Sequence, residues 1–409
     1  MTYEEMCSFE TLYRAYLSAR QGKRSKVGTA QYEANALACT QKLSHILKPM
    51  QVVVDGEVRN VIQYRPSKFE VFYVYEPKKR LVQAPAFVDK VVLHAIVDNI
   101  LYDAICTSFI RDNTASQKQK GTHDGLMRLK HHMVDYYRKN RTAEGWVLKC
   151  DVRKFFASID HDILKTKLKA LLDRRGVDPM VYDMLCIYID ASSGLPLGYQ
   201  TSQLLALMFL DDFDHYIKET KRLRYYGRYM DDFYIISSSK EELRLLLKDI
   251  QNWMTGIGLE LNEKTGIFPL KNGIDFLGFH TYLTESGAVV QKLRHDKIDN
   301  IRARVKYWRW AYPAGLVTKE AILKSFDGWD AHAAHGDTHA LRSKYAKLVG
   351  EIVGEKITPH RKINSTTTAR TNRKLCQYKH ICKKRGDSLI PAGFEEKDCP
   401  SPDDIPPWM

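Results

Sequence analysis

Two adjacent carboxylates, Asp231 and Asp232, stand inside an apolar stretch that is rich in β-forming residues. β-branched and aromatic side chains flank the pair in the segment LRYYGRYMDDFYIIS, residues 223–237. This pattern predicts two short strands joined by a tight turn, with both carboxylates facing one site. Neighbouring carboxylates raise each other's pKa, so a bound cation would keep them ionised. The alternative interpretation is a purely structural turn, because Asp tolerates turn geometry.

A third carboxylate, Asp151, follows a short strand predicted at residues 146–150. Functional groups commonly stand at such strand ends in open sheets. We predict that Phe155 belongs to the core, whereas Phe156 is better placed to press on a sugar ring. Three carboxylates on a strand end and a hairpin are what two Mg²⁺ ions require to clamp the attacking and leaving oxygens of an in-line displacement. A second acidic pair, Asp211–Asp212, is expected to end a helix in a structural role.

Two lysines upstream, Lys118 and Lys120, precede Gly121 in a polar segment. Ammonium groups on a loop suit a triphosphate, because they offset its charge without demanding one geometry. A solvated loop is the alternative interpretation. Together with the three carboxylates, these cations predict a nucleotidyl transferase, in which a primer 3′-hydroxyl attacks the α-phosphorus of a nucleotide and pyrophosphate leaves.

The surrounding patterns predict the elements that position these residues. Helical periodicity marks four stretches: residues 8–47, 88–106, 124–139 and 240–257. Residues 69–75 and 81–85 predict a hairpin with basic residues at its turn. Residues 194–203 form a loop that contains Gly and Pro, and we expect Thr201 or Ser202 to cap the apolar helix that follows.

The overall charge points to a polyanionic partner. The 409 residues include 63 Lys and Arg against 49 Asp and Glu, which gives a net charge of +14 and a pI near 9.2. Such an excess favours nucleic acid or an anionic membrane surface. No apolar run is long enough to span a bilayer, and the start carries acids where a signal peptide would be basic. We therefore expect a soluble cytoplasmic protein with no membrane partner and reduced cysteines.

The last third of the chain changes composition more than once. Residues 292–352 are predicted to be helical, and their interleaved cations and aromatic rings suit nucleic acid, with core tryptophans as the alternative. Residues 356–385 hold ten Lys and Arg and no acid, which predicts an arm on nucleic acid or on an accessory partner. Residues 395–409 are acidic and Pro-rich, which predicts an extended or disordered end. The tail residues that could bind zinc match no compact ligand pattern, so no zinc site is predicted: Cys376, His380, Cys382 and Cys399.

Seven motifs follow one another in this order: Glu76-Pro-Lys-Lys-Arg80, Lys118-Gln-Lys-Gly121, Asp151-Val-Arg-Lys-Phe-Phe156, Gly194-Leu-Pro-Leu-Gly-Tyr-Gln-Thr-Ser-Gln203, Tyr229-Met-Asp-Asp232, Lys264 and Phe276-Leu-Gly-Phe279. Together they resemble a bacterial reverse transcriptase, from fingers through palm to primer grip, over residues 76–280. The later helices resemble a bacterial-type thumb. The resemblance implies an α+β right-hand polymerase, with an antiparallel sheet flanked by helices in the palm, a helical thumb and a basic C-terminal tail.

The resemblance also implies a role for each matching position. Two Mg²⁺ ions, for which Mn²⁺ can substitute, would be bound by Asp151, Asp231, Asp232 and the backbone carbonyl of Val152. The triphosphate would be contacted by Arg80, Lys118 and Lys120, and pyrophosphate would receive a proton from Lys264. The nucleotide and primer would be held by Phe156 as the gate against a ribose 2′-hydroxyl, by Gly198 and Gln203 against the nascent base pair and template, and by Phe276, Leu277 and Gly278 at the primer end.

One departure narrows the resemblance. Retroviral and group II intron enzymes have Gln-Gly and a later Ser-Pro in the loop, whereas this chain has Leu197-Gly198 and Ser202-Gln203. This variant resembles the reverse transcriptases of diversity-generating retroelements, which copy a template-repeat RNA with errors at adenines and work with a small accessory protein. The implied partners are an RNA template, an RNA/DNA or DNA primer, dNTPs, an accessory protein and a structured non-coding RNA.

Two alternatives stay open at the level of the sequence. A bacterial or phage-encoded enzyme of anti-phage defence, or one like a retron reverse transcriptase, would share the same palm. A non-catalytic RNA-binding protein with a decayed palm is the alternative from another class, although the three Asp residues argue against it. The predicted domains are N-terminal helices at 1–75, fingers at 76–145, palm at 146–285, thumb at 286–355 and tail at 356–409.

Overall fold

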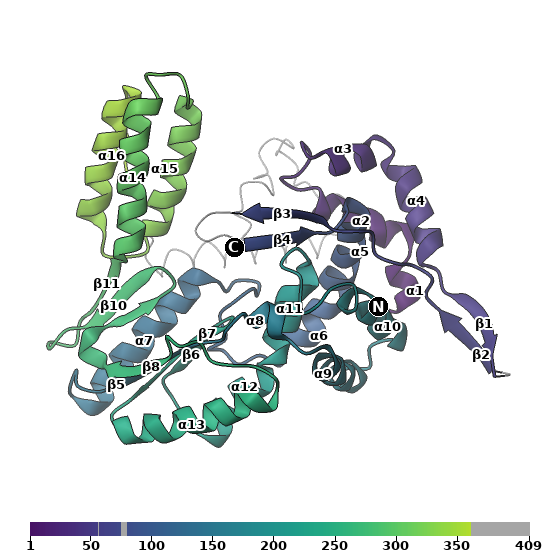
Figure 1. Ribbon diagram of the computed structural model, residues 1–409, viewed down its shortest axis with the longest axis horizontal. Coiled ribbons are helices and arrows are strands. Elements are labelled where there is room, and N and C mark those ends of the chain that lie inside the picture. Colours follow the sequence, from purple (N-terminus) through teal and green to yellow (C-terminus); the bar gives the residue numbers. More distant parts are fainter. Residues whose placement is uncertain (56, 75–79, 361–409) are drawn as a thin grey trace, which may run out of the picture. The chain divides into compact units, whose positions relative to one another are not determined.

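The computed structural model describes residues 1–55, 57–74 and 80–360 (Figure 1). The chain forms two compact units, the first from residues 1–125 and 148–267, and the second from residues 126–147 and the described residues after 267. The predictions for the basic turn at Glu76–Lys79 and for the tail beyond His360, with its Cys and His residues, lie outside the described residues. No helix in the described part of the chain is both long and apolar enough to cross a bilayer.

Four N-terminal helices pack around buried tyrosines. The Tyr16 ring lies 5.3 Å from Tyr32 and 6.3 Å from Phe87, so the second helix is joined to two others by aromatic contacts. Side-chain caps from Thr2 and Ser8 start the first two helices. The helices are α1 (Tyr3–Met6), α2 (Phe9–Ala19), α3 (Val27–Ala34) and α4 (Ala36–Leu47).

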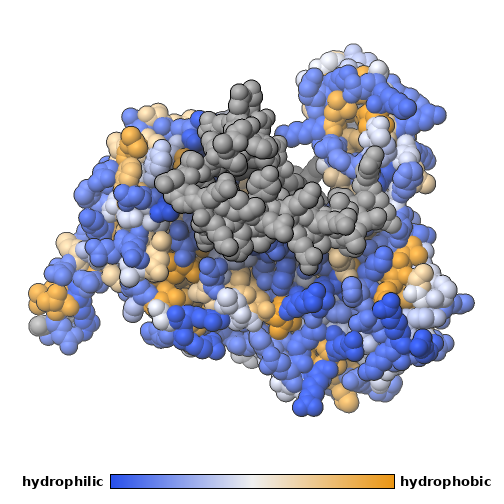
Figure 2. Space-filling view, turned by 180° about the vertical axis from the view of Figure 1, so that it is seen from behind, coloured by the Kyte–Doolittle hydropathy of each residue, from blue (hydrophilic) through white to orange (hydrophobic). Residues whose placement is uncertain are grey.

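Two antiparallel hairpins follow, and the second is the one that the sequence predicted. β1 (Met50–Val54) pairs with β2 (Glu57–Val61), and β3 (Glu70–Val74) pairs with β4 (Arg80–Ala84). The first hairpin projects from the helices (Figure 1). Figure 2 shows apolar side chains gathered on it, at the far left of that view. Its cross-strand pair of Val53 and Val58 is 72% and 65% exposed.

The predicted helix at residues 88–106 is confirmed, with one π-helical turn inside it. It comprises α5 (Phe87–Ile96), η1 (Val97–Leu101) and α6 (Tyr102–Cys106). On α5 the buried carboxylate of Asp89 accepts hydrogen bonds from the hydroxyls of Tyr64 at 2.5 Å and Tyr188 at 3.3 Å, and from the backbone N–H of Ser67 at 3.1 Å. These bonds tie the segment that leads into β3 to two helices of the first unit.

The central sheet carries the acidic residues, and its strands lie in the order β6-β7-β5-β8. They are β5 (Trp146–Asp151), β6 (Tyr226–Tyr229), β7 (Asp232–Ser237) and β8 (Gly266–Pro269). In Figure 1, α13 runs along one face of this sheet. The helices between and after these strands are α8 (Phe155–Ser158), α9 (His161–Arg174), α10 (Pro179–Ile189), α11 (Gln200–Phe209), α12 (Asp211–His215), η2 (Tyr216–Thr220) and α13 (Lys240–Gly256).

Two predictions about α11 are wrong. The helix begins at Gln200 after Tyr199, which forms no side-chain cap, and Thr201 and Ser202 are buried within its first turn. They cannot cap the helix because their own backbones are already helical. The helix ends at Phe209, so the pair Asp211–Asp212 begins α12 and does not end α11.

The second unit combines α7, a small sheet and a bundle of three helices, which confirms the α+β fold class (Figure 1). Trp308 and Tyr345 lie in the core of the bundle, so the core interpretation is confirmed for Trp308. Trp310 is 64% exposed, and its contact with nucleic acid stays a prediction. Lys292 still belongs to a strand, and the helical region begins three residues later than predicted. The elements are α7 (Thr122–Asn140), η3 (Leu270–Asn272), β9 (Ile274–Phe276), β10 (Phe279–Leu283), β11 (Val289–Leu293), α14 (His295–Ala311), α15 (Lys319–Ala333) and α16 (His339–Val353).

A buried ion pair holds the end of the described chain against the bundle. Arg342 of α16 contacts Asp330 of α15 at 2.7 and 3.0 Å, and both side chains are about 2% exposed. The Asp330 carboxylate also accepts a hydrogen bond from the backbone N–H of His360 at 2.7 Å, and Arg342 donates to the backbone carbonyl of His360. The His360 ring contacts the exposed Asp327 at 2.7 Å. The charges of the pair therefore satisfy the backbone of the segment that returns to the bundle.

We expect Asp330→Ala to destabilise the bundle strongly, because it leaves the Arg342 guanidinium buried without its carboxylate. The expected loss is about 3–5 kcal/mol of unfolding free energy, measured by denaturant unfolding followed through tryptophan fluorescence. Asp327→Ala is the matched control, since it removes an exposed partner and should cost about 1 kcal/mol or less. Equal losses in the two variants would contradict a dominant role for the buried pair.

Candidate active site

The predicted acidic hairpin is present at the end of β6 and β7. Tyr229 pairs with Asp232 across the two strands, so Met230 and Asp231 form the turn between them. Met230 has a φ of 57°, which is a left-handed conformation that costs a non-glycine residue about 1–2 kcal/mol. A strained turn is retained only where its surroundings determine it, and such strain concentrates at functional sites.

The backbone joins the third carboxylate to this turn. The N–H of Val152, directly after Asp151, donates to the carbonyl of Asp231 at 3.3 Å. The carbonyl of Asp151 accepts the N–H of Asn262 at 2.7 Å, so the end of β5 is held from both sides. Asp151 thus lies at the end of β5, next to the turn and strand start that carry Asp231 and Asp232 in the same sheet. This is the strand and hairpin that the sequence predicted.

The electrostatics of the turn favour a bound cation. Burial raises the pKa of the Asp231 carboxyl above its ordinary value, and the negative charge of Asp151 raises it further. The positive charges of Arg80 and Lys149 offset part of this rise. A divalent cation would lower the pKa of Asp231 as these two side chains do, and more strongly, because it carries twice the charge.

Lys149 is a site residue that the sequence reasoning missed. Its ammonium forms an ion pair with the Asp232 carboxylate and also acts on Asp231. The signal was present in the sequence, since Lys149 precedes Asp151 by two residues on one strand and therefore shares its face. In this structure the lysine is the cation that stands beside the acidic turn.

The donor set suits Mg²⁺, although the described side chains are not arranged as a finished metal site. Hard carboxylate and carbonyl oxygens are the ligands that Mg²⁺ prefers. Asp232 forms an ion pair with the Lys149 ammonium. Nowhere among residues 1–55, 57–74 and 80–360 do three or more acidic, His or Cys side chains converge as ligands of one ion.

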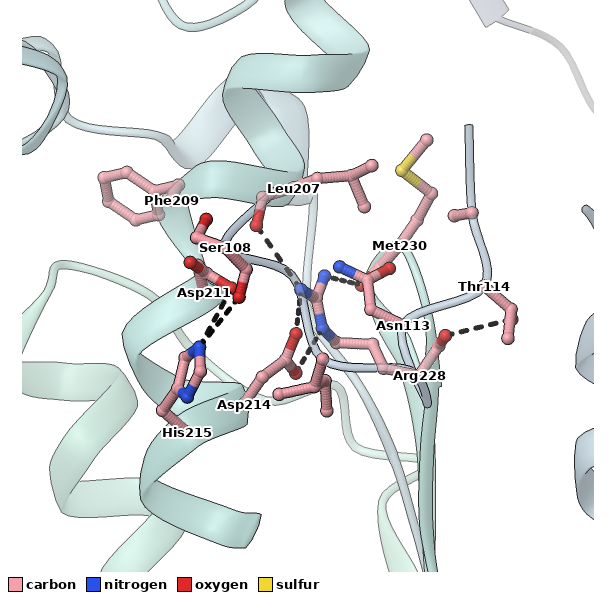
Figure 3. A network of polar contacts seen from close by, with 12 residues as sticks. Ser108, Asn113, Thr114, Leu207, Phe209, Asp211, Asp214, His215, Arg228 and Met230 are labelled. Carbon is pink, nitrogen blue, oxygen red and sulfur yellow. Dashed lines mark hydrogen bonds and ion pairs between the residues drawn. The ribbon is translucent and has the colours of Figure 1, made fainter. Parts of the chain in front are cut away.

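A buried arginine supports the turn from below (Figure 3). Arg228 of β6 is fully buried, and its guanidinium contacts the buried Asp214 of α12 at 2.7 and 2.6 Å. It also donates to the carbonyl of Met230 at 2.9 Å and to that of Leu207 at 3.3 Å. Burial alone would lower the pKa of Arg228, but the charge of Asp214 outweighs it and raises the pKa. The hydroxyl of Tyr226 donates to the same carboxylate.

The loop at residues 112–114 completes the support of β6. Asn113 forms a parallel bridge with Arg228, whose N–H donates to the carbonyl of Asp112 at 3.0 Å. The N–H of Thr114 returns a hydrogen bond to the Arg228 carbonyl at 3.1 Å. The loop therefore bonds both backbone polar groups of Arg228, its N–H and its carbonyl.

The residues predicted to contact a triphosphate differ in their surroundings. Arg80 opens β4, is exposed and acts on Asp231 by its charge. Lys118 is exposed, and its ammonium lies 4.4 Å from the centre of the Tyr102 ring. The Lys120 ammonium donates to backbone carbonyls of its own loop, at 2.9 Å for Asn113. Lys120 therefore stabilises the loop in this structure, while Arg80 and Lys118 present their charges to solvent.

The glycine-bearing loop packs on the backbone around it. The N–H of Leu195 donates to the carbonyl of Phe156 at 2.7 Å, which places this loop directly against α8. Gly198 lies so close to β4 that an added Cβ would overlap the carbonyl of Gln83. Gln203, in the first turn of α11, is exposed and accepts a hydrogen bond from Ser116 at 2.8 Å. Phe155 is buried as predicted, and Phe156 is only partly buried.

The remaining predicted residues lie in turns. Lys264 is exposed in the turn before β8, where its N–H donates to the side chain of Asn262 at 3.2 Å. In the second unit, Phe276 and Phe279 pair across β9 and β10, and Leu277 and Gly278 form the turn with φ of 51° and 87°. Two successive positive φ values are typical of a tight hairpin turn. The roles of these residues stay predictions.

The chain is similar to known proteins in sequence and in fold. Residues 75–281 match the family model described as reverse transcriptase (RNA-dependent DNA polymerase). Protein YkfC of Escherichia coli K12 is 24% identical over 287 aligned residues, with 58% of this chain and 74% of that protein covered. The COX1/OXI3 intron 2 protein of Saccharomyces cerevisiae is 24% identical over 205 residues, and this chain spans only 24% of its length. An apo telomerase structure from Candida tropicalis has a TM-score of 0.44 at 13% identity, with 79% of this chain and 66% of that chain covered.

We expect Asp214→Ala to cost about 3–5 kcal/mol of unfolding free energy, because Arg228 is left as an unpaired buried charge. The double variant Asp214→Leu with Arg228→Met should recover most of that stability, since it removes both charges. Thermal and denaturant unfolding measure both effects. The matched control is Asp212→Ala on the same helix, where the ion pair with Lys167 is exposed and should contribute about 1 kcal/mol or less. A single variant as stable as this control would contradict the support that we assign to the pair.

The raised pKa of Asp231 makes a second prediction with a definite sign. The folded protein holds this proton more tightly than the unfolded chain does, so lowering the pH through the raised pKa of Asp231 stabilises the fold and neutralises this one carboxylate. Asp231→Asn should therefore raise the melting temperature at neutral pH and remove this part of the pH dependence, whereas the exposed control Glu263→Gln should do neither. A lower melting temperature for Asp231→Asn would contradict the assignment.

Proposed function

The chain belongs to the reverse transcriptase family, and we propose that it is an RNA-directed DNA polymerase that extends a primer 3′-hydroxyl with deoxynucleotides. The observation that carries the proposal is the strained turn of Met230 and Asp231, tied by its backbone to Val152 beside Asp151. Strand-end and hairpin carboxylates so joined are what nucleotidyl transfer needs at the attacking hydroxyl and the leaving group. The net charge of +14 supports a nucleic-acid substrate.

Each residue near the turn has a task in this proposal. Asp151, Asp231, Asp232 and the carbonyl of Val152 would bind the Mg²⁺ ions. When bound, the ions would neutralise the charge that develops on the attacking and leaving oxygens. Lys149 would exchange its contact with Asp232 for one with the substrate, because a metal ion competes for the same carboxylate.

The nucleotide would be oriented by groups on three sides of the turn. Arg80 and Lys118 present positive charge to solvent and suit the triphosphate, whereas Lys120 would have to leave its own loop to do so. Phe156, held by the loop at Leu195, would exclude a ribose 2′-hydroxyl by its bulk. Lys264 would protonate the departing pyrophosphate.

We further propose that the enzyme serves a diversity-generating retroelement. The support is the loop sequence Leu197-Gly198 with Ser202-Gln203, in which Leu197 is 44% exposed at the surface of the first unit. An apolar side chain at that position cannot hydrogen-bond the incoming nucleotide, which reduces discrimination between correct and wrong bases. The template would be a repeat RNA, and the partners would include an accessory protein and a structured non-coding RNA.

Primer extension tests the polymerase proposal directly. Purified protein with Mg²⁺ or Mn²⁺, dNTPs and a primed RNA should extend the primer, and Asp231→Asn should reduce the rate by at least about 10³-fold, because charge stabilisation at the reacting atoms is lost. Glu263→Gln should extend as the wild type does. An unchanged extension rate in Asp231→Asn, or no primer extension by the wild type, would contradict the proposal and favour a non-catalytic RNA-binding protein.

Sequencing the RNA that co-purifies with the protein, and the cDNA made from it, tests the proposed role. A repeat template and substitutions concentrated at template adenines are expected for diversification. An accurate copy of another structured RNA would instead indicate an enzyme of the retron or defence type.

A further inference from the structure

The loop at residues 112–120 contacts both β6 and α11, the helix that carries Gln203. At one end Asp112 and Thr114 bond the backbone of Arg228, directly before the acidic turn. A few residues later the hydroxyl of Ser116 donates to the Oε1 atom of Gln203 at 2.8 Å, across 87 residues of sequence. The loop therefore contacts both β6, which ends directly before the acidic turn, and α11, which carries Gln203.

The loop is held rigid by its own side chains. Lys120 donates to the carbonyl of Asn113 at 2.9 Å, and the amide of Gln117 donates to the same carbonyl at 2.8 Å. The N–H of Lys118 bonds the hydroxyl of Tyr102 on α6. These contacts leave the short stretch around Ser116 little freedom to move relative to β6.

Ser116 occupies a left-handed backbone conformation, with a φ of 46°. Gly would adopt this conformation without strain, whereas a residue with a Cβ pays for it. In this backbone conformation the Ser116 hydroxyl reaches the exposed side-chain amide of Gln203. Strained backbone conformations of this kind concentrate at functional sites.

We propose that Ser116 is a positioning residue that fixes the Gln203 carboxamide for contact with the template nucleotide. The inference rests on the proposed polymerase function. Because the Oε1 atom of Gln203 accepts the Ser116 hydroxyl, the two N–H bonds of the same amide are left to donate outward. The matching group is a hydrogen-bond acceptor of the template nucleotide, either the base edge in the minor groove or the 2′-oxygen.

This contact would read pairing geometry. Every base presents an acceptor at its minor-groove edge, N3 of a purine or O2 of a pyrimidine, so a donor there detects position more than identity. An amide free to rotate could present its oxygen instead and would lose this discrimination. The hydrogen bond from Ser116 fixes the orientation of the Gln203 amide. Because the same loop bonds Arg228, contact between Gln203 and the template would be coupled to the position of the acidic turn.

Ser116→Gly is the informative variant, because it relieves the backbone strain and removes the hydroxymethyl side chain, and with it the hydroxyl that bonds Gln203. Its melting temperature should match or exceed that of the wild type. In primer extension on RNA, kcat/KM for the correct dNTP should fall about three- to ten-fold, the range expected for one hydrogen bond, and misincorporation should rise. Gln203→Ala should show the same loss, and Ser116→Gly should add nothing to it, because Ser116 acts only through Gln203.

Two modified templates identify the acceptor. A 3-deazaadenosine in the template removes the base-edge nitrogen, and a 2′-deoxy nucleotide removes the sugar oxygen. The wild type should lose efficiency on one of them, and Ser116→Gly should lose nothing further on that template. Gln119→Ala is the control, since Gln119 has a left-handed φ of 65° in the same loop but no role in the proposal.

The outcomes separate the inference from the function on which it rests. A wild type that extends no primer contradicts the polymerase proposal. A wild type that extends normally while Ser116→Gly keeps its kcat/KM and error frequency overturns the inference, as does an equal loss in Gln119→Ala. Additive losses in the double variant of Ser116 and Gln203 would also overturn it, because the two residues would then act separately.

Discussion

The buried ion pair of Arg228 and Asp214 is the interaction on which the site depends most. Taking two charges out of water is costly unless each is fully paired, and here the guanidinium also donates to the carbonyl of Met230. The pair thus connects a helix under the sheet to the turn that carries Asp231. The planar guanidinium of Arg228 bonds the Asp214 carboxylate and the Met230 carbonyl in fixed directions at once, so it fixes where the turn lies relative to the helix.

Three residues with strained backbones stand in or near the segments that form the site. Met230, Ser116 and Lys154 all have left-handed backbones without being glycine, and they lie in the acidic turn, in the loop that bonds β6, and just after Asp151. Each such residue costs free energy that the surrounding packing must offset. The arrangement favours a preorganised scaffold in which Lys149 and the carboxylate side chains adjust, while the backbone that carries them does not.

Much of the site was predictable because its signals are local. The hairpin around Asp231 and Asp232, the strand ending at Asp151 and the helix at residues 87–106 follow from periodicity and turn chemistry over a few residues. The wrong predictions were local too, since Thr201 and Ser202 look like caps until the helix start at Gln200 is known. Lys149 was overlooked although its spacing from Asp151 places both on one strand face.

By itself, the sequence determined the fold class, the order of the motifs and the three carboxylates, because those depend on residue types and short spacings. Only the tertiary structure decided which groups support them. Asp214 and Arg228 are 14 residues apart and Ser116 and Gln203 are 87 apart, and no periodicity relates either pair. Their contacts exist because the fold brings distant segments together in a buried or crowded place, where an unpaired polar group would be costly.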